Sequence, residues 1–296
     1  MCPKDSNPRT LAKEEYPATL ASSKFMPGKI FIKGELPRKA AFIAMVGTRR
    51  PSSGAEDRCN ALVKNLRGTN AAVVSGLAQG IDSLCHKAAL DNGIPTIAVL
   101  AQGLGTHIGG SREILAREIL EAGGALLSEY PGDTPPYKSN FPARNRIIEG
   151  LSQATAVVES KSEGGALITA AFCIEEKRPL FAVPGDWDRE TATGPIELLR
   201  TGKAKPIWNP FDFADLCGAV RKSDLTLADF SKTAPGLSES AEKLISRNTG
   251  FTRSIAELQQ SAGLALPALL AILTELEMAG LAHSKDGNSF HFSALE

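Results

Sequence analysis

The sequence predicts an α/β protein: a Rossmann-like, doubly wound, mainly parallel sheet followed by a small C-terminal winged-helix domain. From about residue 29 to 208, short apolar runs alternate with amphipathic helical patterns. The runs are apolar almost throughout, which is typical of parallel strands covered by helices on both faces. Residues 237–296 change to three helical patterns and a hairpin signal, the outline of a winged helix.

The expected strands are rich in β-branched or apolar residues and lie at 29–32, 42–46, 71–75, 96–100, 125–129, 154–159 and 180–183. The clearest helix lies between the second and third of these runs. One face of it is formed by Ala55, Cys59, Leu62, Val63 and Leu66. Ser52 or Ser53 is available as its N-cap.

The C-terminal part begins after a stretch rich in Ser, Thr, Lys and Asp, which we interpret as a linker at 221–236. Three helices are expected at 238–247, 254–262 and 266–279. Two short strands, 281–285 and 289–292, flank the turn signal Asp286-Gly287-Asn288. The chain is therefore divided into an N-terminal tail (1–14), a Rossmann-like domain (15–220), the linker and a winged-helix domain (237–296).

Composition narrows the functional classes. The 296 residues carry 33 basic and 33 acidic side chains, so only a local positive patch is available for nucleic acid. No apolar run reaches the ~20 residues of a membrane span, and the N-terminus lacks a secretory apolar region. The five cysteines form no C-x-x-C pair, which indicates reduced thiols and no structural zinc. A cytoplasmic, non-membrane protein is expected.

Three strand ends are unusually rich in small residues. In an open parallel sheet, ligands collect at the carboxyl ends of the strands, where helix N-termini present free N–H groups. Glycine lets the backbone approach a phosphate, and arginine offers it a bidentate fork. We expect anion-binding residues from these three ends, namely Gly47, Thr48, Arg49, Arg50, Ser75, Gly76, Gln79, Gly80, Gly164 and Gly165.

The segment 135–152 mixes aromatic, cationic and amide side chains, as a binding site for single-stranded nucleic acid requires. Aromatic rings stack on unpaired bases, and cations hold phosphates. The residues expected to bind DNA here are Lys138, Asn140, Phe141, Arg144, Asn145 and Arg146. On one helix, Arg144 and Arg146 cannot both face the same groove, so one of them can instead form a structural salt bridge.

These segments, in this order, resemble the DNA-processing protein A family (DprA, also called Smf). The resemblance rests on Val46-Gly47-Thr48-Arg49, the string 75–82, and above all Phe-Pro-Ala-Arg-Asn-Arg-Ile-Ile at 141–148. It extends from about residue 15 to 205. Ala166 departs from the family pattern, where a hydroxyl residue is usual, and only about 14 residues precede the Tyr16-Pro17 lead-in, where many members carry a further small helical domain.

The resemblance implies a homodimer that binds single-stranded DNA and helps to load the RecA recombinase during natural transformation. It implies no catalytic residues and no cofactor. The residues agree with this, since the chain has neither a G-x-G-x-x-G fingerprint nor a Walker A loop. Asp82 and His86 lie four apart on a helix but have no third partner, so a satisfied, partly buried histidine is preferred to a metal site.

Two other classes stay open. One is a nucleotide-binding or nucleotide-hydrolysing enzyme of the lysine-decarboxylase-like phosphoribohydrolase type, although the loop at Glu163-Gly164-Gly165 lacks the acid of that chemistry. The other is a ligand-sensing regulator on the same fold.

The winged helix is a poor candidate for reading DNA. Residues 237–296 carry four Lys/Arg and seven Asp/Glu, a net charge of −3. The helix at 266–279 has apolar residues on nearly every side, so we expect part of it to contact a partner or the large domain.

Overall fold

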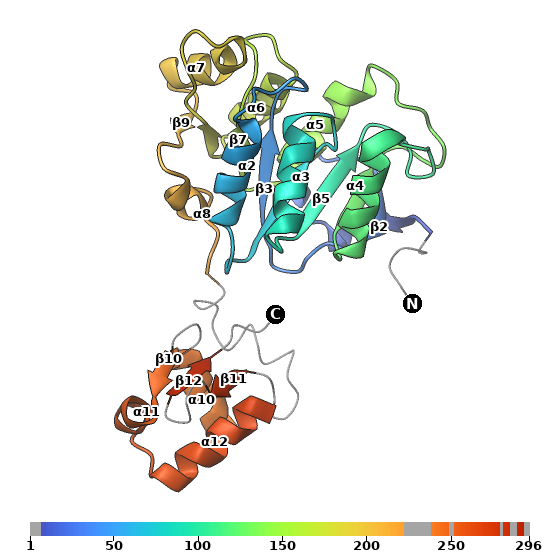
Figure 1. Cartoon of the computed structure of the whole chain (residues 1–296). Coiled ribbons are helices and arrows are strands. Elements are labelled where there is room, and N and C mark those ends of the chain that lie inside the picture. Colours follow the sequence, from blue (N-terminus) through green and yellow to red (C-terminus); the bar gives the residue numbers. More distant parts are fainter. Residues whose placement is uncertain (1–6, 222–237, 249–251, 279–280, 285–288, 293–296) are drawn as a thin grey trace. The chain divides into compact units, whose positions relative to one another are not determined.

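The computed structural model describes residues 7–221, 238–248, 252–278, 281–284 and 289–292 (Figure 1). The chain folds into two compact units, Met1–Ala219 and Val220–Glu296. All but the first residue of the expected linker lies outside the described residues, as does the expected turn at Asp286–Asn288.

The first unit contains a nine-stranded sheet in the order β1-β2-β6-β5-β4-β3-β7-β8-β9. Its strands are β1 (Arg9–Leu11), β2 (Ile30–Gly34), β3 (Ala41–Val46), β4 (Ala71–Ser75), β5 (Thr96–Leu100), β6 (Ala125–Ser128), β7 (Ala154–Val157), β8 (Leu180–Ala182) and β9 (Lys205–Pro206). In the sheet, the seven neighbouring strands β6, β5, β4, β3, β7, β8 and β9 run parallel to one another. Strand β2 pairs antiparallel with β6, and β1 pairs antiparallel with β2. All seven expected strands are present, and the predicted mainly parallel sheet is confirmed.

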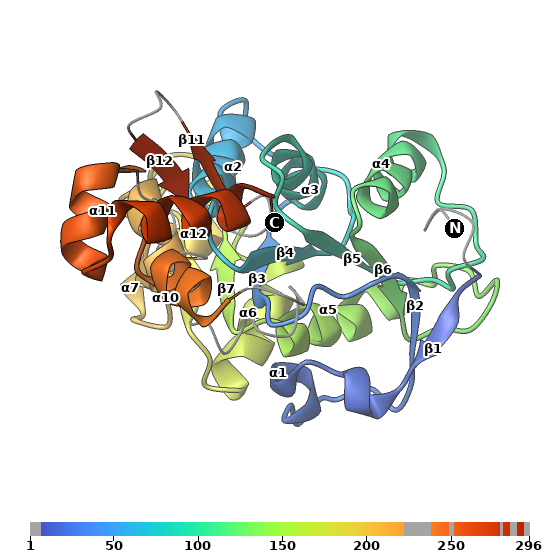
Figure 2. The same ribbon diagram turned by 90° about the horizontal axis from the view of Figure 1, so that it is seen from below.

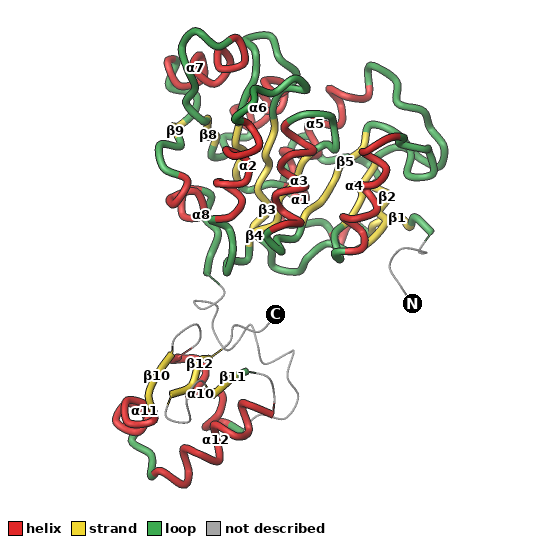
Figure 3. Tube along the Cα trace, viewed as in Figure 1, coloured by secondary structure: helices red, strands yellow, loops and turns green. Residues whose placement is uncertain are grey.

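Helices cover both faces of this sheet (Figures 2 and 3). They are α1 (Ala18–Ala21), α2 (Ala55–Lys64), α3 (Ile81–Asp91), α4 (Gly110–Glu121), α5 (Asn140–Leu151), α6 (Ala166–Glu175), α7 (Thr193–Arg200) and α8 (Phe213–Leu216). The alternation of β3 explains the two layers. Ile43 and Met45 pack with α2 and α3, whereas Ala44 and Val46 pack with α5 and α6.

The chain direction reverses at β3. From β3 it proceeds outward through β4, β5 and β6, and it then returns to the other side of β3 as β7. The loops that follow β3 and β7 therefore diverge, and a crevice opens between them at the carboxyl ends of the strands. Ligands of doubly wound folds bind at such a switch point.

The prediction that Ser52 or Ser53 caps α2 is wrong. The N-cap is Gly54, which has no side-chain capping bond. Ser52 lies two residues further out, and its hydroxyl donates instead to Glu159 beyond β7, at 2.5 Å. The Ser52 hydroxyl thus donates to a tertiary acceptor and accepts no hydrogen bond from the first turn of α2.

The second unit contains α10 (Glu239–Asn248), α11 (Ile255–Ala262), α12 (Leu266–Met278) and a three-stranded sheet in the order β10-β12-β11. Its strands are β10 (Thr252–Ser254), β11 (Ala282–Ser284) and β12 (Ser289–Phe292). Ser254 caps α11 by accepting from the Glu257 amide, and Gly263 ends it at φ 65°. The predicted winged helix is confirmed, with β10 as a strand that the sequence did not indicate.

Most apolar side chains of α12 pack inside this unit. Leu269, Leu273 and Leu276 are buried, together with Ile272. Among the side chains of α12 that the structure describes, the large apolar ones left exposed are Leu266 and Leu270, at 43% and 41%. Contact of this surface with a partner or with the large domain stays a prediction.

No helix within the described residues is by itself long and apolar enough to cross a membrane. Only α11 and α12 taken together reach that length and composition, and the chain bends by 108° between them. The four cysteines in the described part, Cys59, Cys85, Cys173 and Cys217, are buried and form no disulfide.

Candidate functional site

A pocket opens at the switch point between β3 and β7. Its lining comes from the loop after β3, the start of α3, the first turns of α5, and the loop from β7 into α6. The lining residues are Val46, Gly47, Thr48, Arg49, Ala78, Asp82, Phe141, Pro142, Arg144, Asn145, Ile148, Lys161, Gly164, Gly165, Ala166, Ile168 and Thr169. Eight of the predicted DNA-binding residues are among them, so tertiary structure brings together segments that lie far apart in the sequence.

The charge of this pocket is positive. Its lining carries three cations, Arg49, Arg144 and Lys161, against one carboxylate, Asp82. The N-terminus of α6 also faces the pocket, since Gly164, Gly165 and Ala166 line it. Helix N-termini favour anions through their free N–H groups and the helix dipole. The pocket therefore suits a phosphate.

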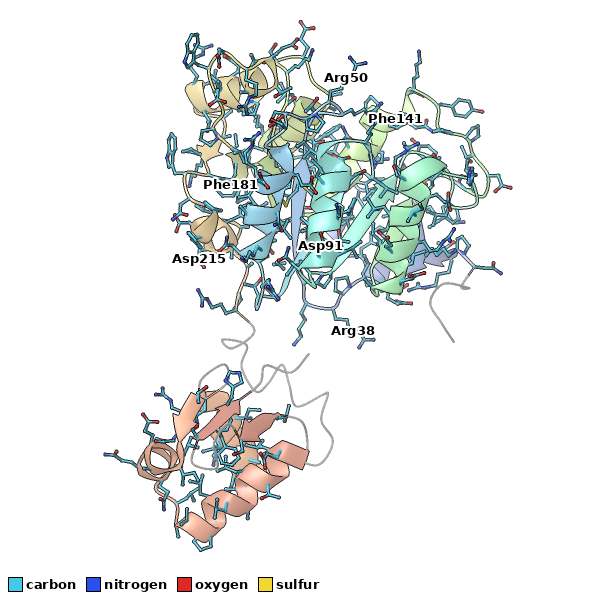
Figure 4. All side chains as sticks on the ribbon, viewed as in Figure 1. Arg38, Arg50, Asp91, Phe141, Phe181 and Asp215 are labelled. Atoms are coloured by element: carbon cyan, nitrogen blue, oxygen red, sulfur yellow. The ribbon has the colours of Figure 1, made fainter. Side chains whose placement is uncertain are left out.

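Arg49 and Phe141 join two of the predicted segments. The Arg49 guanidinium lies 4.9 Å from the centroid of the Phe141 ring, within the range of a cation–π contact. In Figure 4 Phe141 and Arg50 lie at the carboxyl ends of the parallel strands, and Arg38 and Asp91 lie toward their amino ends. A cation and an aromatic face are thus presented at one place.

Glu159 holds the loops around the pocket in place. Its buried carboxylate accepts hydrogen bonds from the Ser52 amide and from Thr191 Oγ1, each at 2.9 Å, and forms an ion pair with Arg58. Burial alone would raise the pKa of Glu159, but the hydrogen bonds from Ser52, Arg58 and Thr191 outweigh it and lower the pKa. The Glu159 carbonyl accepts from the Thr48 amide at 2.7 Å. One residue thus ties the loop after β3 to the end of β7 and to Thr191 in the segment that follows β8.

Arg144 has a largely internal role in the free protein. Its side chain is buried, and its Nη1 donates to the carbonyl of Gly76, at 2.6 Å, and to that of Val99. Burial lowers the pKa of Arg144 to about 10, and nearby Asp82 opposes this effect. The guanidinium therefore remains charged at neutral pH and places a fixed positive charge beneath the pocket.

A second pocket adjoins the first. It is lined by Arg49, Gly76, Leu77, Ala78, Gln79, Leu100, Ala101, Gln102, Ile108, Arg112, Phe141 and Arg144. The two pockets share Arg49, Ala78, Phe141 and Arg144. The Arg49–Phe141 pair accordingly lies between two concave regions, each of which contains a further arginine or lysine.

Several predicted DNA-binding residues line neither pocket. Ser75 is fully buried and donates to the Met45 carbonyl at 2.6 Å. Asn140 is buried and donates to the Ala101 carbonyl at 3.1 Å, and Arg146 pairs with Glu129. A Cβ on Gly80 would lie 2.3 Å from the Thr48 carbonyl oxygen, which gives this glycine a steric role.

Arg50 and Lys138 are exposed but lie outside both pockets. A structural salt bridge was predicted for one of Arg144 and Arg146. In the structure Arg146 forms an ion pair with Glu129, and Arg144 donates to the Gly76 carbonyl. Contact of all these residues with DNA remains a prediction.

Lys161 is the pocket cation that sequence reasoning missed. It lies two residues after Glu159 and three before Gly164, at the end of a predicted strand. The prediction for this strand end rested on Gly164 and Gly165 and did not include the cation that precedes them. A count of cations over the whole strand end would have found it.

His86 is fully buried, and its Nδ1 lies 2.7 Å from Thr96 Oγ1. The Nε2 atom has no hydrogen-bond partner in the described structure, so the expected satisfied histidine is only half right. Burial, assisted by Arg144, lowers the pKa of His86 to about 3, which keeps it neutral. The described residues contain no cluster of three or more His, Cys, Asp or Glu side chains suited to a metal ion.

The fold and the site define a Rossmann-like protein with a positively charged pocket at its switch point, joined to a winged-helix unit. Residues 7–218 match the family described as DNA recombination-mediator protein A, and residues 230–288 match the DprA winged helix domain. The chain belongs to the DNA recombination-mediator protein A family.

Characterised relatives support this membership. Protein Smf of Escherichia coli is 42% identical over 191 residues, which cover 64% of this chain and 51% of the relative. DNA processing protein DprA of Bacillus subtilis is 39% identical over 204 residues, 68% of each protein. The match thus spans about half of the first relative and two thirds of the second.

Two solved structures share the fold. DNA processing protein A from Helicobacter pylori, described for its single-stranded DNA binding mode, gives a TM-score of 0.65 at 28% identity, covering 72% of this chain and 96% of that one. DNA processing protein A from Streptococcus pneumoniae gives 0.65 at 34% identity, covering 71% and 73%.

Proposed function

We propose that this protein binds single-stranded DNA in the pocket between the loops that follow β3 and β7. The observation that carries the proposal is the Arg49–Phe141 pair, at which a phosphate-binding cation meets an aromatic ring beside the N-terminus of α6. Stacking on an aromatic ring requires an unpaired base, which duplex DNA does not offer. The adjoining second pocket gives the strand room to continue past this pair.

Family membership supports the wider role. We propose that the protein acts in the cytoplasm as a recombination mediator that protects incoming single strands and loads a RecA recombinase during natural transformation, and that it works as a homodimer. The family description and the single-stranded DNA binding mode described for the Helicobacter pylori relative support this proposal.

Full-length protein should bind an oligonucleotide such as dT30 more tightly than a duplex of the same length, without marked sequence preference. We expect a difference of about tenfold or more, since each stacked base contributes roughly 1–3 kcal/mol. Fluorescence-anisotropy titrations of single- and double-stranded oligonucleotides at two salt concentrations provide the measurement. Equal affinity for both forms, or no binding to either, would refute the proposal.

Gly165→Ala should weaken single-strand binding by about three- to tenfold without affecting stability. A Cβ on Gly165 meets no atom within 4 Å, and the backbone lies at φ −59°, ψ −22°, which alanine adopts readily. The added methyl group would instead occupy space where a phosphate approaches the N-terminus of α6. Gly28→Ala is the matched control, because that position is equally open and lies outside both pockets. Unchanged affinity of Gly165→Ala would show that the strand does not approach α6.

A further inference from the structure

Lys161 forms an ion pair with Glu190 in the free protein. Its Nζ lies 2.6 Å from Oε1 of Glu190, while the same side chain lines the pocket at the switch point. Both members of the pair remain accessible, with side chains 49% and 72% exposed. A carboxylate oxygen is thus placed on a pocket cation, where a phosphate oxygen of a bound strand would be expected.

The position of Glu190 is fixed by the backbone. It begins the short helix η3 (Glu190–Ala192), which follows β8. The Ser160 amide donates to the Thr191 carbonyl at 2.7 Å, and the Gly194 amide donates to the Ser160 carbonyl at 2.9 Å. Thr191 also donates to the buried Glu159 carboxylate. Because Thr191 and Gly194, which follow Glu190, are hydrogen-bonded to Glu159 and Ser160 just before Lys161, this carboxylate is held within reach of Lys161.

The pair is easily exchanged. Exposed ion pairs contribute little to stability, because water solvates both charges well. A DNA phosphate offers the ammonium group an equivalent acceptor, and the adjoining helix terminus and Arg49 favour the phosphate further. The neighbouring Arg189 pairs with Asp186, and its Nη1 lies 3.9 Å from Glu159, so it is engaged elsewhere.

We propose that Lys161 is a phosphate ligand of the bound single strand, and that Glu190 holds this lysine in the free protein and releases it when DNA enters. The proposal rests on the proposed function of the same pocket. Glu190 thereby acts as an internal competitor that lowers affinity for any anion that reaches Lys161.

Three variants of the full chain test this exchange. Lys161→Ala should weaken binding to dT30 by about five- to tenfold and lower the slope of log K against log salt by roughly 0.7, the loss of one phosphate contact. Glu190→Gln should strengthen binding by about two- to fivefold, because it frees Lys161. The double variant should bind like Lys161→Ala, because without the Lys161 ammonium group the Glu190 carboxylate has no cation with which to compete for phosphate.

Two controls separate this exchange from a general charge effect. Glu197→Gln removes the carboxylate of the exposed Arg200–Glu197 pair on α7, and should leave affinity within about twofold. If Glu190→Gln acts only by removing a negative charge from the surface, it will strengthen binding equally in the Lys161→Ala background. That additive result would overturn the proposal.

The outcomes also separate this proposal from the proposed function. If the unmodified protein does not bind dT30, the proposed function fails. If it binds and Lys161→Ala binds equally well at the same salt slope, the function stands and Lys161 is not a ligand. Thermal unfolding of each variant should match the unmodified protein, because both side chains are exposed.

Discussion

Arg144→Met should lower the free energy of unfolding of the first unit by about 3–5 kcal/mol. The substitution retains the length of the side chain but removes a buried charge that donates to the carbonyls of Gly76 and Val99. It also leaves Asp82 without the largest of the effects that oppose the rise of its pKa on burial. Buried polar groups that lose their partners pay their full desolvation cost.

Urea unfolding followed by circular dichroism provides the measurement, analysed separately for the transition of each unit. Arg50→Met is the matched control, because Arg50 is exposed and projects from the same edge of the sheet (Figure 4). Its effect should stay within about 0.5 kcal/mol. A cost below 1 kcal/mol for Arg144→Met would mean that Arg144 is not structural. If the variant does not fold, Arg144→Lys, which retains the charge, should recover a folded protein of intermediate stability.

Arg49→Ala should weaken single-strand binding by about tenfold or more and leave the fold intact. Arg49 is exposed beyond the end of β3 and contacts Phe141 within the pocket, so its loss removes one charge-assisted phosphate contact, worth about 1.5–3 kcal/mol. The slope of log K against log salt should fall by roughly 0.7. Anisotropy titrations at several salt concentrations measure both quantities.

Arg38→Ala is the control for this experiment. Arg38 is also exposed but lies at the opposite end of the strands, just before the amino end of β3 (Figure 4). It should change neither the affinity nor the salt slope. If both variants lose affinity equally, the strand follows general positive charge rather than the pocket. If Arg49→Ala unfolds, Arg49 is a structural residue.

The strands and helices could be predicted closely because their signals are local. Apolar runs of four to six residues bounded by small or polar residues located all seven expected strands. Ser254 also follows a local rule, since its partner Glu257 is three residues away. Strand β10 escaped prediction because Thr252–Ser254 has no apolar pattern and is held by pairing with β12.

The residues that line the two pockets could be predicted only in part. Glycines and Arg49 at strand ends indicated the pocket, because steric freedom and charge can be inferred from residue type. The same reasoning placed Asn140 among the expected DNA ligands; in the free protein its side-chain amide donates to the Ala101 carbonyl, and its contact with DNA stays a prediction. Ser52 was expected to cap α2 but binds Glu159. In both cases the side chain binds a partner that is distant in sequence, which local sequence patterns do not reveal.

The sequence by itself thus determined the α/β class, the order of the elements and the residue types at the strand ends, because each depends on neighbours along the chain. Tertiary structure alone decided which strand ends meet. Return of the chain to β3 as β7 places Lys161 in the same pocket as Arg49 and Phe141, and η3 brings Glu190 onto Lys161. These contacts depend on strand pairing and burial across long stretches of sequence, where local periodicity carries no information.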